Sequence, residues 1–249
     1  YVFCGNCGSS GNFKINAGDT VNNQEINYKN TQKINSVAIA VKVNSDDKVE
    51  WVNILENQST YNQIIENDNG EFIVIGSTGK GKLPSSLMED NTELELIESY
   101  TTIRLSDSGK IIEVKNPGQT LNGIRTYKTS DNGIILANNY NLIKLNSIGD
   151  IEWEKPHAQT ITHKKLIEVS DGYVDFGCYV GNYKEKAENT VDNKSINING
   201  VDGQEGIVIK YNQKGLIEWI KILKGSGNDC IVSGIEMSNN ELLILGNSE

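Results

Sequence analysis

Two cysteines near the start of the chain and two histidines in its second half have the spacing of reactive or metal-binding groups. Cys4 and Cys7 form a Cys-x-x-Cys motif, the spacing of thiol–disulfide exchange proteins. A reactive pair normally sits at the start of a helix, which lowers the thiol pKa, but "CGNC" runs into a polar stretch. We therefore expect structural thiols or a local disulfide. His157 and His163 are the only histidines. Without further ligands near them in sequence, we expect exposed loop histidines and no metal site.

Oxygen-bearing side chains gather at 192–206, "DNKSININGVDGQEG", which ends in Asp202, Gly203 and Glu205. Calcium takes such oxygen ligands, but the ligand order of an EF-hand loop is not met. We predict a polar connecting loop and no cofactor, and keep calcium as the alternative. The glycine-rich stretches "GKGK" (79–82) and "GSGND" (225–229) are not followed by a helical pattern, so neither predicts a phosphate-binding loop.

Charge and hydropathy exclude some classes of partner. The chain has 249 residues and a formal net charge of -10, which argues against a nucleic-acid-binding protein because these normally carry a basic stripe. No apolar run approaches the roughly 18 residues that a membrane-spanning helix needs. We expect neither nucleic-acid binding nor membrane insertion.

One phrase occurs four times, and it predicts the elements that must position any functional group. The copies are "VKVNSDDKVEW" (41–51), "IRLSDSGKIIE" (103–113), "IKLNSIGDIEW" (143–153) and "IKYNQKGLIEW" (209–219). Each predicts two strands joined by a three-residue turn with a bulge, whose last residue must take a positive φ. That residue is Asp47, Gly109, Gly149 or Gly215. Across the strands, lysine faces glutamate at Lys42–Glu50, Lys144–Glu152 and Lys210–Glu218, whereas the second copy has Arg104 opposite Ile112.

A third and a fourth strand are expected after each hairpin. The fourth reads "EFIVIGS", "GIILANN", "YVDFGCY" and "LLILGNS". A repeated four-stranded antiparallel meander with a fixed tryptophan predicts an all-β fold, the β-propeller. The predicted blades cover approximately residues 37–77, 99–138, 141–179 and 206–247, and "YVFCG" (1–5) matches the last strand of a preceding blade. We therefore expect a single propeller domain or a propeller fragment, in which Trp51, Trp153 and Trp219 fill the seams between blades.

The stretch "IKYNQKGLIEWIKILKGSGND" followed by "ELLILGNS" resembles the bacterial secreted propeller-type repeat written KLDxxGxxxW…GGSGxD…DGGYIxxGxT. The fixed tryptophan is also similar to the tryptophan-docking repeats of PQQ-dependent dehydrogenases. The resemblance covers about residues 37 to 249 and implies a secreted or cell-surface bacterial propeller, with no particular activity. This chain departs from the pattern at the aspartate before the turn, which is replaced by Asn44, Ser106, Asn146 and Asn212.

In a propeller, the connections after the fourth strands share one face with those after the second strands. Here that face would carry the long loops 6–36, 77–98 and 178–205 and the shorter loops 55–60, 115–120, 155–160 and 223–229. Long loops on a rigid scaffold are where binding concentrates. The candidate ligand-binding residues on this face are Tyr61, Tyr140, Tyr179, Tyr183, His157 and Asp229, with Tyr100 as a further rim aromatic.

These expectations favour a non-catalytic recognition module that binds a protein or a glycan through its long-loop face. The alternative is a propeller-fold enzyme acting on glycans, a hydrolase or lyase, which would need two or more acidic or histidine side chains converging at the ring centre. A structural spacer is the second alternative. No catalytic residue and no metal ligand is predicted.

Overall fold

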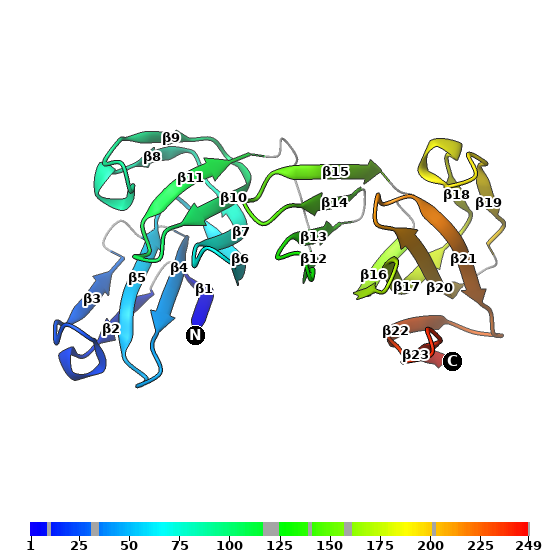
Figure 1. The fold of residues 1–249 in the computed structure, drawn as a ribbon, viewed down its shortest axis with the longest axis horizontal. Coiled ribbons are helices and arrows are strands. Elements are labelled where there is room, and N and C mark those ends of the chain that lie inside the picture. Colours follow the sequence, from blue (N-terminus) through cyan, green and yellow to red (C-terminus); the bar gives the residue numbers. More distant parts are fainter. Residues whose placement is uncertain are drawn as a thin grey trace. The chain divides into compact units, whose positions relative to one another are not determined.

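The computed structural model describes residues 1–8, 11–30, 35–116, 125–138, 141–156, 161–200 and 203–248. Antiparallel strands dominate these residues (Figure 1), so the prediction of an all-β protein is confirmed. The chain forms two compact units. Unit 1 is Tyr1–Thr120 with Ser147–Gly149, and unit 2 is Leu121–Asn146 with Asp150–Glu249. Among the described residues, none of the helices has the length and apolarity needed to cross a membrane.

Unit 1 contains two main sheets, and their strands are antiparallel neighbours. Sheet 1 has the order β1 (Val2–Gly8), β4 (Ser36–Val43) and β5 (Val49–Leu55). Sheet 2 has the order β6 (Thr60–Glu66), β7 (Phe72–Thr78), β10 (Ser99–Leu105) and β11 (Ile111–Lys115).

Unit 2 repeats this pattern. Sheet 3 consists of β12 (Arg125–Lys128), β13 (Ile134–Ala137), β14 (Asn141–Leu145) and β15 (Ile151–Pro156). Sheet 4 consists of β16 (Ile161–Val169), β17 (Gly172–Val180), β20 (Gln204–Asn212) and β21 (Ile217–Leu223). Sheet 5 consists of β22 (Asp229–Glu236) and β23 (Leu242–Ser248).

The predicted hairpins are confirmed down to their turns. All four turn residues have positive φ, from 59° at Asp47 to 83° at Gly149, and each hairpin has a register shift beside the turn. The three lysine–glutamate pairs form ion pairs, with Nζ–Oε2 distances of 2.9, 3.2 and 3.1 Å. In the second hairpin, Arg104 instead pairs with Glu113 and Glu71.

The predicted division into blades places the sheet boundaries wrongly. We expected the hairpin to pair with the strand that follows it, but β5 does not lie beside β6 in a sheet; instead β7 pairs with β10, β13 with β14 and β17 with β20. Each four-stranded sheet therefore combines the third and fourth strands of one predicted unit with the hairpin of the next. The ranges 37–77, 99–138, 141–179 and 206–247 each straddle two sheets.

The burial of the strands explains this arrangement. Strands β7, β13 and β17 are buried on both faces, whereas the tryptophan-bearing strands β5, β15 and β21 have partly exposed faces. A strand that is apolar on both faces belongs in the interior of a sheet and needs a hydrogen-bonding partner on each side. The apolar runs "FIVIGST" and "YVDFGCY" therefore mark sheet centres and not sheet ends.

The glycine near the end of these central strands makes room for a bulge in the neighbouring strand. Gly76 and Gly177 lie opposite register shifts in β6 and β16. A Cβ atom at Gly76 would lie 1.8 Å from the carbonyl oxygen of Thr60, and one at Gly177 would lie 2.4 Å from that of Thr162. In sheet 3, where the described pairing of β12 with β13 has no such shift, the same position is Ala137.

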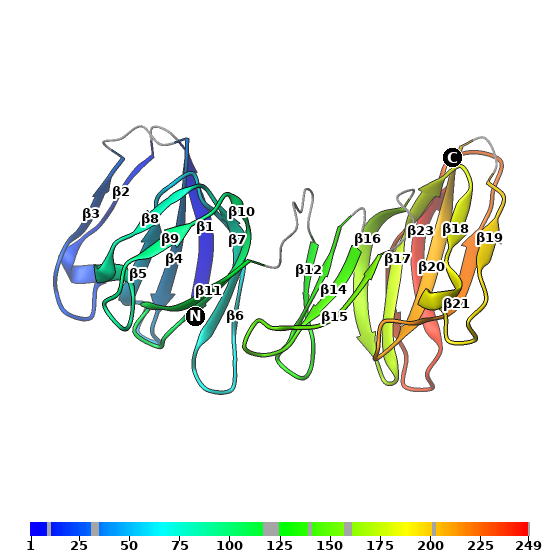
Figure 2. The same ribbon diagram turned by 90° about the horizontal axis from the view of Figure 1, so that it is seen from above.

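The three long connections are not irregular loops, which corrects our expectation. Each forms a hairpin arm with a 3₁₀ turn between its two short strands (Figures 1 and 2). The first arm is β2 (Asn12–Ile15), η1 (Ala17–Asp19) and β3 (Ile26–Lys29). The second arm is β8 (Gly81–Leu83), η2 (Ser85–Leu87) and β9 (Leu94–Leu96). The third arm is β18 (Tyr183–Glu185), η3 (Ala187–Asn189) and β19 (Ile196–Ile198).

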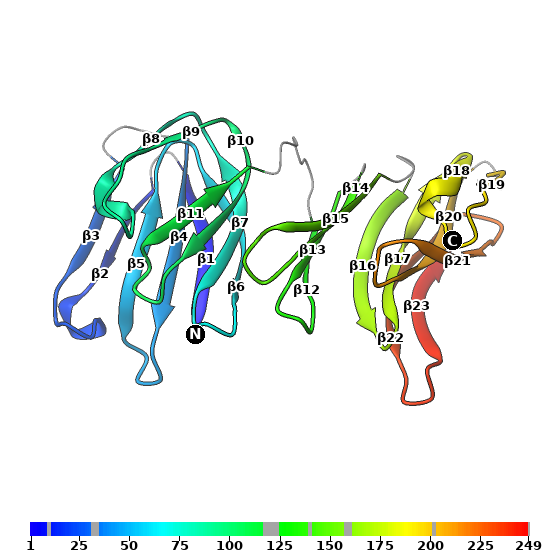
Figure 3. The same ribbon diagram turned by 45° about the horizontal axis from the view of Figure 1, so that its top comes forward.

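Each arm is fastened to the outer strand of its own sheet. Parallel bridges join Thr20 to Val49, Met88 to Ile111 and Thr190 to Ile217. In each case the residue after the bridge donates its backbone N–H to the carbonyl oxygen of the outer strand, at 2.8–3.1 Å. These outer-strand residues directly follow the hairpin turn, so each arm runs along the sheet from one end to the other (Figure 3).

Candidate functional site

The repeated tryptophan packs beneath the hairpin turn of the following sheet in both units. In unit 1, Trp51 Nε1 donates to the carbonyl oxygen of Asp107 at 2.8 Å, and in unit 2, Trp153 Nε1 donates to that of Gln213 at 2.9 Å. A Cβ atom at Gly109 or Gly215 would lie within 2.4–2.8 Å of these indole rings. The glycines therefore serve both the positive φ and the close approach of the ring. Trp219 packs against the cluster of Val169, Val174, Phe176, Val208 and Ile231, and Gly149 faces Thr102 in place of an indole.

The tyrosines that we placed on an exposed rim are buried. The exposed fractions of Tyr61, Tyr179 and Tyr183 are 2%, 0% and 0%, and that of Tyr100 is 4%. Tyr61 OH donates to Asn53 Oδ1 at 3.1 Å, and Tyr183 OH donates to Glu185 Oε2 at 3.1 Å. Burial raises the pKa of Tyr61 and of Tyr183 far above the usual range. The rim prediction is wrong for these residues, because the bases of the arms and the adjoining strands cover them.

Tyr140 and His157 lie outside the residues that the structure describes. Asp229 lies at the start of β22 and is 6% exposed. Of the four described candidates, Tyr61 belongs to unit 1 and Tyr179, Tyr183 and Asp229 belong to unit 2.

A groove in unit 1 does bring polar and apolar side chains together. It has a volume of about 360 Å³ and lies where β5 ends, between the first and second arms; its lining residues are Tyr28, Ile54, Leu55, Glu56, Asn57, Lys82, Leu83, Pro84, Ser86 and Leu87. This volume falls in the range of ligand pockets. Sheets 1 and 2 follow one another along the chain, and each carries an arm. The groove lies between these two arms.

The floor of the groove is aliphatic and its rim is polar. Leu55 and Leu83 are fully buried beneath it. Tyr28 OH donates to Glu56 Oε1 at 3.1 Å, and its ring stacks on Phe13 with centroids 5.4 Å apart. Burial, and then the charge of Glu56, raise the pKa of Tyr28 to about 12. The phenol therefore stays a hydrogen-bond donor at neutral pH.

The loop after β5 is fixed to the second arm. Asn57 and Gln58 both have positive φ, 68° and 56°, a conformation that asparagine adopts more readily than most residues. Asn57 Nδ2 donates to the carbonyl oxygen of Lys82 at 3.3 Å. The groove is thus a formed feature of unit 1.

Two of the arms share a sequence motif that indicates their common local structure. The stretches "AGDTVNNQ" (17–24) and "AENTVDNK" (187–194) are alike. Thr20 and Thr190 each donate a hydroxyl hydrogen bond within the arm and accept one from the backbone four residues later. This internal repeat predicts that the two stretches share a local structure. The first stretch belongs to the arm that carries Tyr28.

His163 is not an exposed loop residue. It is buried on β16, and its Nδ1 atom forms a hydrogen bond with Asp175 Oδ2 on β17. Burial lowers the pKa of His163, but the charge of Asp175 and its hydrogen bond outweigh burial, so the pKa is raised. The positive charge of Arg125 lowers the pKa of His163. The negative charge of Asp175 also contributes, after burial, to the raised pKa values of Tyr127, Tyr183 and Tyr211.

The pair makes the stability of unit 2 depend on pH. A raised pKa in the folded state means that the charged pair stabilises fully below the unfolded value of about 6.5, and that this contribution is lost as pH rises through the folded value. We expect the urea midpoint of the wild type to fall from pH 6 to pH 8.5, and that of His163→Gln to change less. An equal change in the urea midpoint between pH 6 and pH 8.5 for the wild type and for His163→Gln would contradict this expectation.

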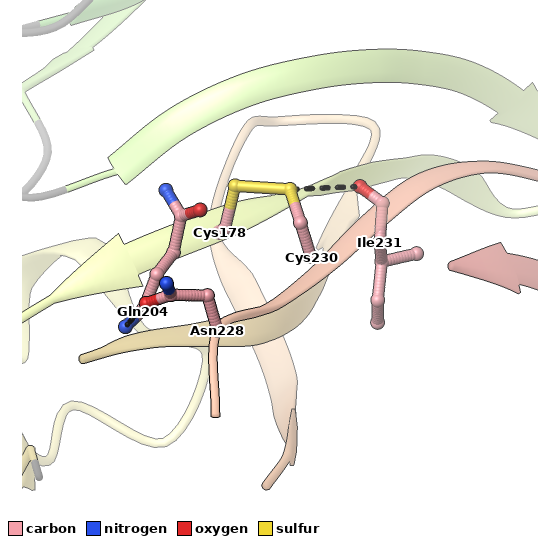
Figure 4. Close-up of a disulfide and its surroundings, with 5 residues drawn as sticks. All are labelled: Cys178, Gln204, Asn228, Cys230 and Ile231. Carbon is pink, nitrogen blue, oxygen red and sulfur yellow. Dashed lines mark hydrogen bonds between the residues drawn. A yellow bond between two sulfur atoms is a disulfide. The ribbon is translucent and has the colours of Figure 1, made fainter. Parts of the chain in front are cut away.

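Of the two alternatives for the Cys-x-x-Cys motif, the structure has the free thiols and not the local disulfide. Cys178 on β17 and Cys230 on β22 form a disulfide (Figure 4), whereas Cys4 and Cys7 are free. The disulfide joins sheet 4 to sheet 5. In unit 1, Asn6 follows Gly5 on β1 in the way that Cys178 follows Gly177 on β17. Asn6 Nδ2 donates to the carbonyl oxygen of Tyr61 on β6, and Asn6 Oδ1 accepts from Tyr61 N. The same position of the repeat thus forms a disulfide in unit 2 and side-chain amide hydrogen bonds in unit 1.

Among the described residues, no group of three or more histidine, cysteine, aspartate or glutamate side chains is placed to hold a metal ion. In the described part of 192–206, Asp192 pairs with Lys194 at 3.0 Å, and the third arm uses Thr190 to close its turn. The calcium alternative stays a prediction.

No protein-family model matches the chain, and no curated protein is significantly similar to it.

Proposed function

We propose that this chain is a non-catalytic recognition module that binds an extended peptide segment of a partner protein in the groove between its first and second arms. The observation that carries the proposal is the groove itself, which joins an aliphatic floor to a rim of hydrogen-bonding groups. An apolar peptide side chain matches Leu87, which lies over the buried Leu55 and Leu83, and the peptide main chain matches the polar rim. A glycan, which presents hydroxyls on most sides, would leave the aliphatic floor unused.

The strands beside the groove support a peptide ligand. In the described residues, β3 and β8 each pair with a single strand, β2 and β9 respectively. Asn57 lies against β8 and donates to the carbonyl oxygen of Lys82, so the second edge of β3 is the one to which an extended peptide can add. Tyr28 on β3 and Lys82 on β8 both line the groove.

We further propose that the sheets are blades of a β-propeller and that the protein is exported or displayed at the cell surface. The successive antiparallel meanders, and the indole rings packed under the next hairpin, support the first proposal. The disulfide supports the second, because disulfides persist in oxidising compartments. The buried His163–Asp175 pair favours no catalytic role, since its own strands and the tyrosines around it cover it.

Selection of peptides tests the binding function. Random peptides displayed on phage would be selected on the wild-type protein, and their affinities measured by fluorescence anisotropy. Ser86→Trp places a large side chain in the groove, and the matched control Glu188→Trp alters the same position of the third arm. We expect Ser86→Trp to weaken the selected peptides at least about tenfold, a loss of about 1.4 kcal/mol, and Glu188→Trp to leave them unchanged. A failure to enrich any peptide, or equal affinities for both variants, would refute the proposal.

A further inference from the structure

A second pocket lies in unit 2, at the same place in the repeat as the groove of unit 1. Its volume is also about 360 Å³, and it is lined by Leu223, Lys224, Gly225, Asp229, Cys230, Ile231, Ile244, Gly246, Asn247 and Ser248. Leu223 ends β21 as Leu55 ends β5. Instead of two arms, the loop "GSGND" and strands β22 and β23 enclose this pocket.

The pocket contains a carboxyl group with one oxygen atom that has no hydrogen-bond partner among the described residues. Asp229 is 6% exposed, and within the described residues its Oδ2 atom is buried without a hydrogen-bond partner. No lysine, arginine or histidine of the described chain forms an ion pair with it. Lys224, the nearest lysine in sequence, directs its Nζ atom to the carbonyl oxygen of Asn199 at 3.4 Å. A buried carboxylate oxygen without a partner costs free energy, and a ligand that donates a hydrogen bond from a positively charged group would reduce this cost.

The loop is shaped to hold this carboxylate. A Cβ atom at Gly225 would lie 2.6 Å from Asp229 Oδ2, so glycine is the residue that lets the backbone approach so closely. Asn228 Oδ1 accepts a hydrogen bond from Gln204 N at 3.1 Å, and Cys230 is tied to Cys178 (Figure 4). The residues on both sides of Asp229 are therefore anchored to sheet 4.

The walls of the pocket are aliphatic. Ile231 is buried, and Leu223 and Ile244 expose 41% and 37% of their surface. A ligand that fits both the carboxylate and these walls has an apolar stem and a cationic head. The side chain of lysine is built in this way, since its four methylene groups bury readily while its ammonium group seeks a charge.

We infer that this pocket is a second binding site, distinct from the peptide groove, and that it takes a primary alkylammonium group. Electrostatic attraction to Asp229 fixes the head, and contact with Leu223, Ile231 and Ile244 holds the stem. Two sources share this chemistry, the lysine side chain of a partner protein and a free alkylamine.

Titration with matched probes tests the site. Hexylamine and 1-hexanol share an alkyl chain and differ in charge, and Nα-acetyl-lysine amide represents a lysine within a peptide. Binding would be followed by the methyl NMR signals of Ile231 and Ile244. We expect hexylamine to bind the wild type at least about tenfold more tightly than hexanol does, and to lose this advantage in Asp229→Asn and at high salt. The exposed Asp192→Asn is the control and should retain it. Binding of the lysine amide would identify a partner's lysine as the source, and its absence a free amine.

A second variant covers the case in which Asp229→Asn does not fold. Ile244→Trp keeps the carboxylate and fills the pocket from β23, and it should abolish hexylamine binding. Equal binding of hexylamine and hexanol, or hexylamine binding that persists in the folded Asp229→Asn protein or in Ile244→Trp, would overturn the inference. The Ser86→Trp variant leaves this site intact, so failure here is separable from failure of the peptide groove.

Discussion

Replacement of Trp153 by alanine is expected to lower the free energy of unfolding of unit 2 by about 3–5 kcal/mol. The substitution removes an indole that packs on Gly215 and lies 6.2 Å, between ring centroids, from Tyr173. It also leaves the carbonyl oxygen of Gln213 without the hydrogen bond from Trp153 Nε1. Because glycine at 215 has no side chain to fill the space, the cavity cannot close by a local rotamer change.

The matched control is Trp153→Phe, which keeps an aromatic ring and loses the indole N–H. We expect it to cost roughly 1 kcal/mol, the net value of one hydrogen bond, plus a smaller packing loss. Urea unfolding followed by circular dichroism measures both changes without relying on tryptophan fluorescence. An alanine variant no less stable than the phenylalanine variant would show that the indole is not a structural element of this seam.

Loss of the disulfide between Cys178 and Cys230 is expected to destabilise unit 2 by about 4 kcal/mol. The two residues are 52 positions apart, and opening a loop of this length releases much chain entropy in the unfolded state. The double variant Cys178→Ser/Cys230→Ser should therefore unfold at a markedly lower urea concentration than the wild type, and a reductant should shift the wild type in the same direction.

Two controls isolate the contribution of this bond. The double variant Cys4→Ser/Cys7→Ser changes the free cysteines and should leave the effect of the reductant intact. Thiol titration of the unreduced, denatured wild type should detect two thiols, since two of the four cysteines are free. A count of four thiols, or a urea midpoint that does not respond to the reductant, would contradict the assigned pairing.

The sequence predicts the hairpins well because local chemistry determines them. A three-residue turn needs a positive φ at one position, and glycine or aspartate there fixes the turn, the bulge and the lysine–glutamate pairs together. The pairing of strands that lie far apart in the chain is harder to predict from the sequence. Strand β7 pairs with β10 across the whole second arm, so the meander could not be divided correctly by following the order of strands alone.

The candidate site was predicted less well than the fold, again for a physical reason. Tyr61, Tyr179 and Tyr183 flank loops in the sequence, yet their rings point into the cores of their units and lie beneath arms and strands. Tyr28 belongs to an arm whose structure depends on threonine-closed turns and a bridge to β5. Asp229 was predicted as a ligand-binding residue because it ends the loop 223–229. The structure shows in addition that its Oδ2 atom is buried without a partner among the described residues, which the sequence does not reveal.

Methyl NMR of leucine-labelled protein bound to a selected peptide tests the central proposal, recognition by the groove between the two arms, most directly. Leu55, Leu83 and Leu87 line the groove, whereas Leu242, Leu243 and Leu245 lie on β23 in unit 2. We predict intermolecular contacts and the largest shifts at the first three leucines, with the β23 signals unchanged. Peptide contacts at β23, or unchanged signals at Leu55, Leu83 and Leu87 when the peptide is bound, would contradict the account.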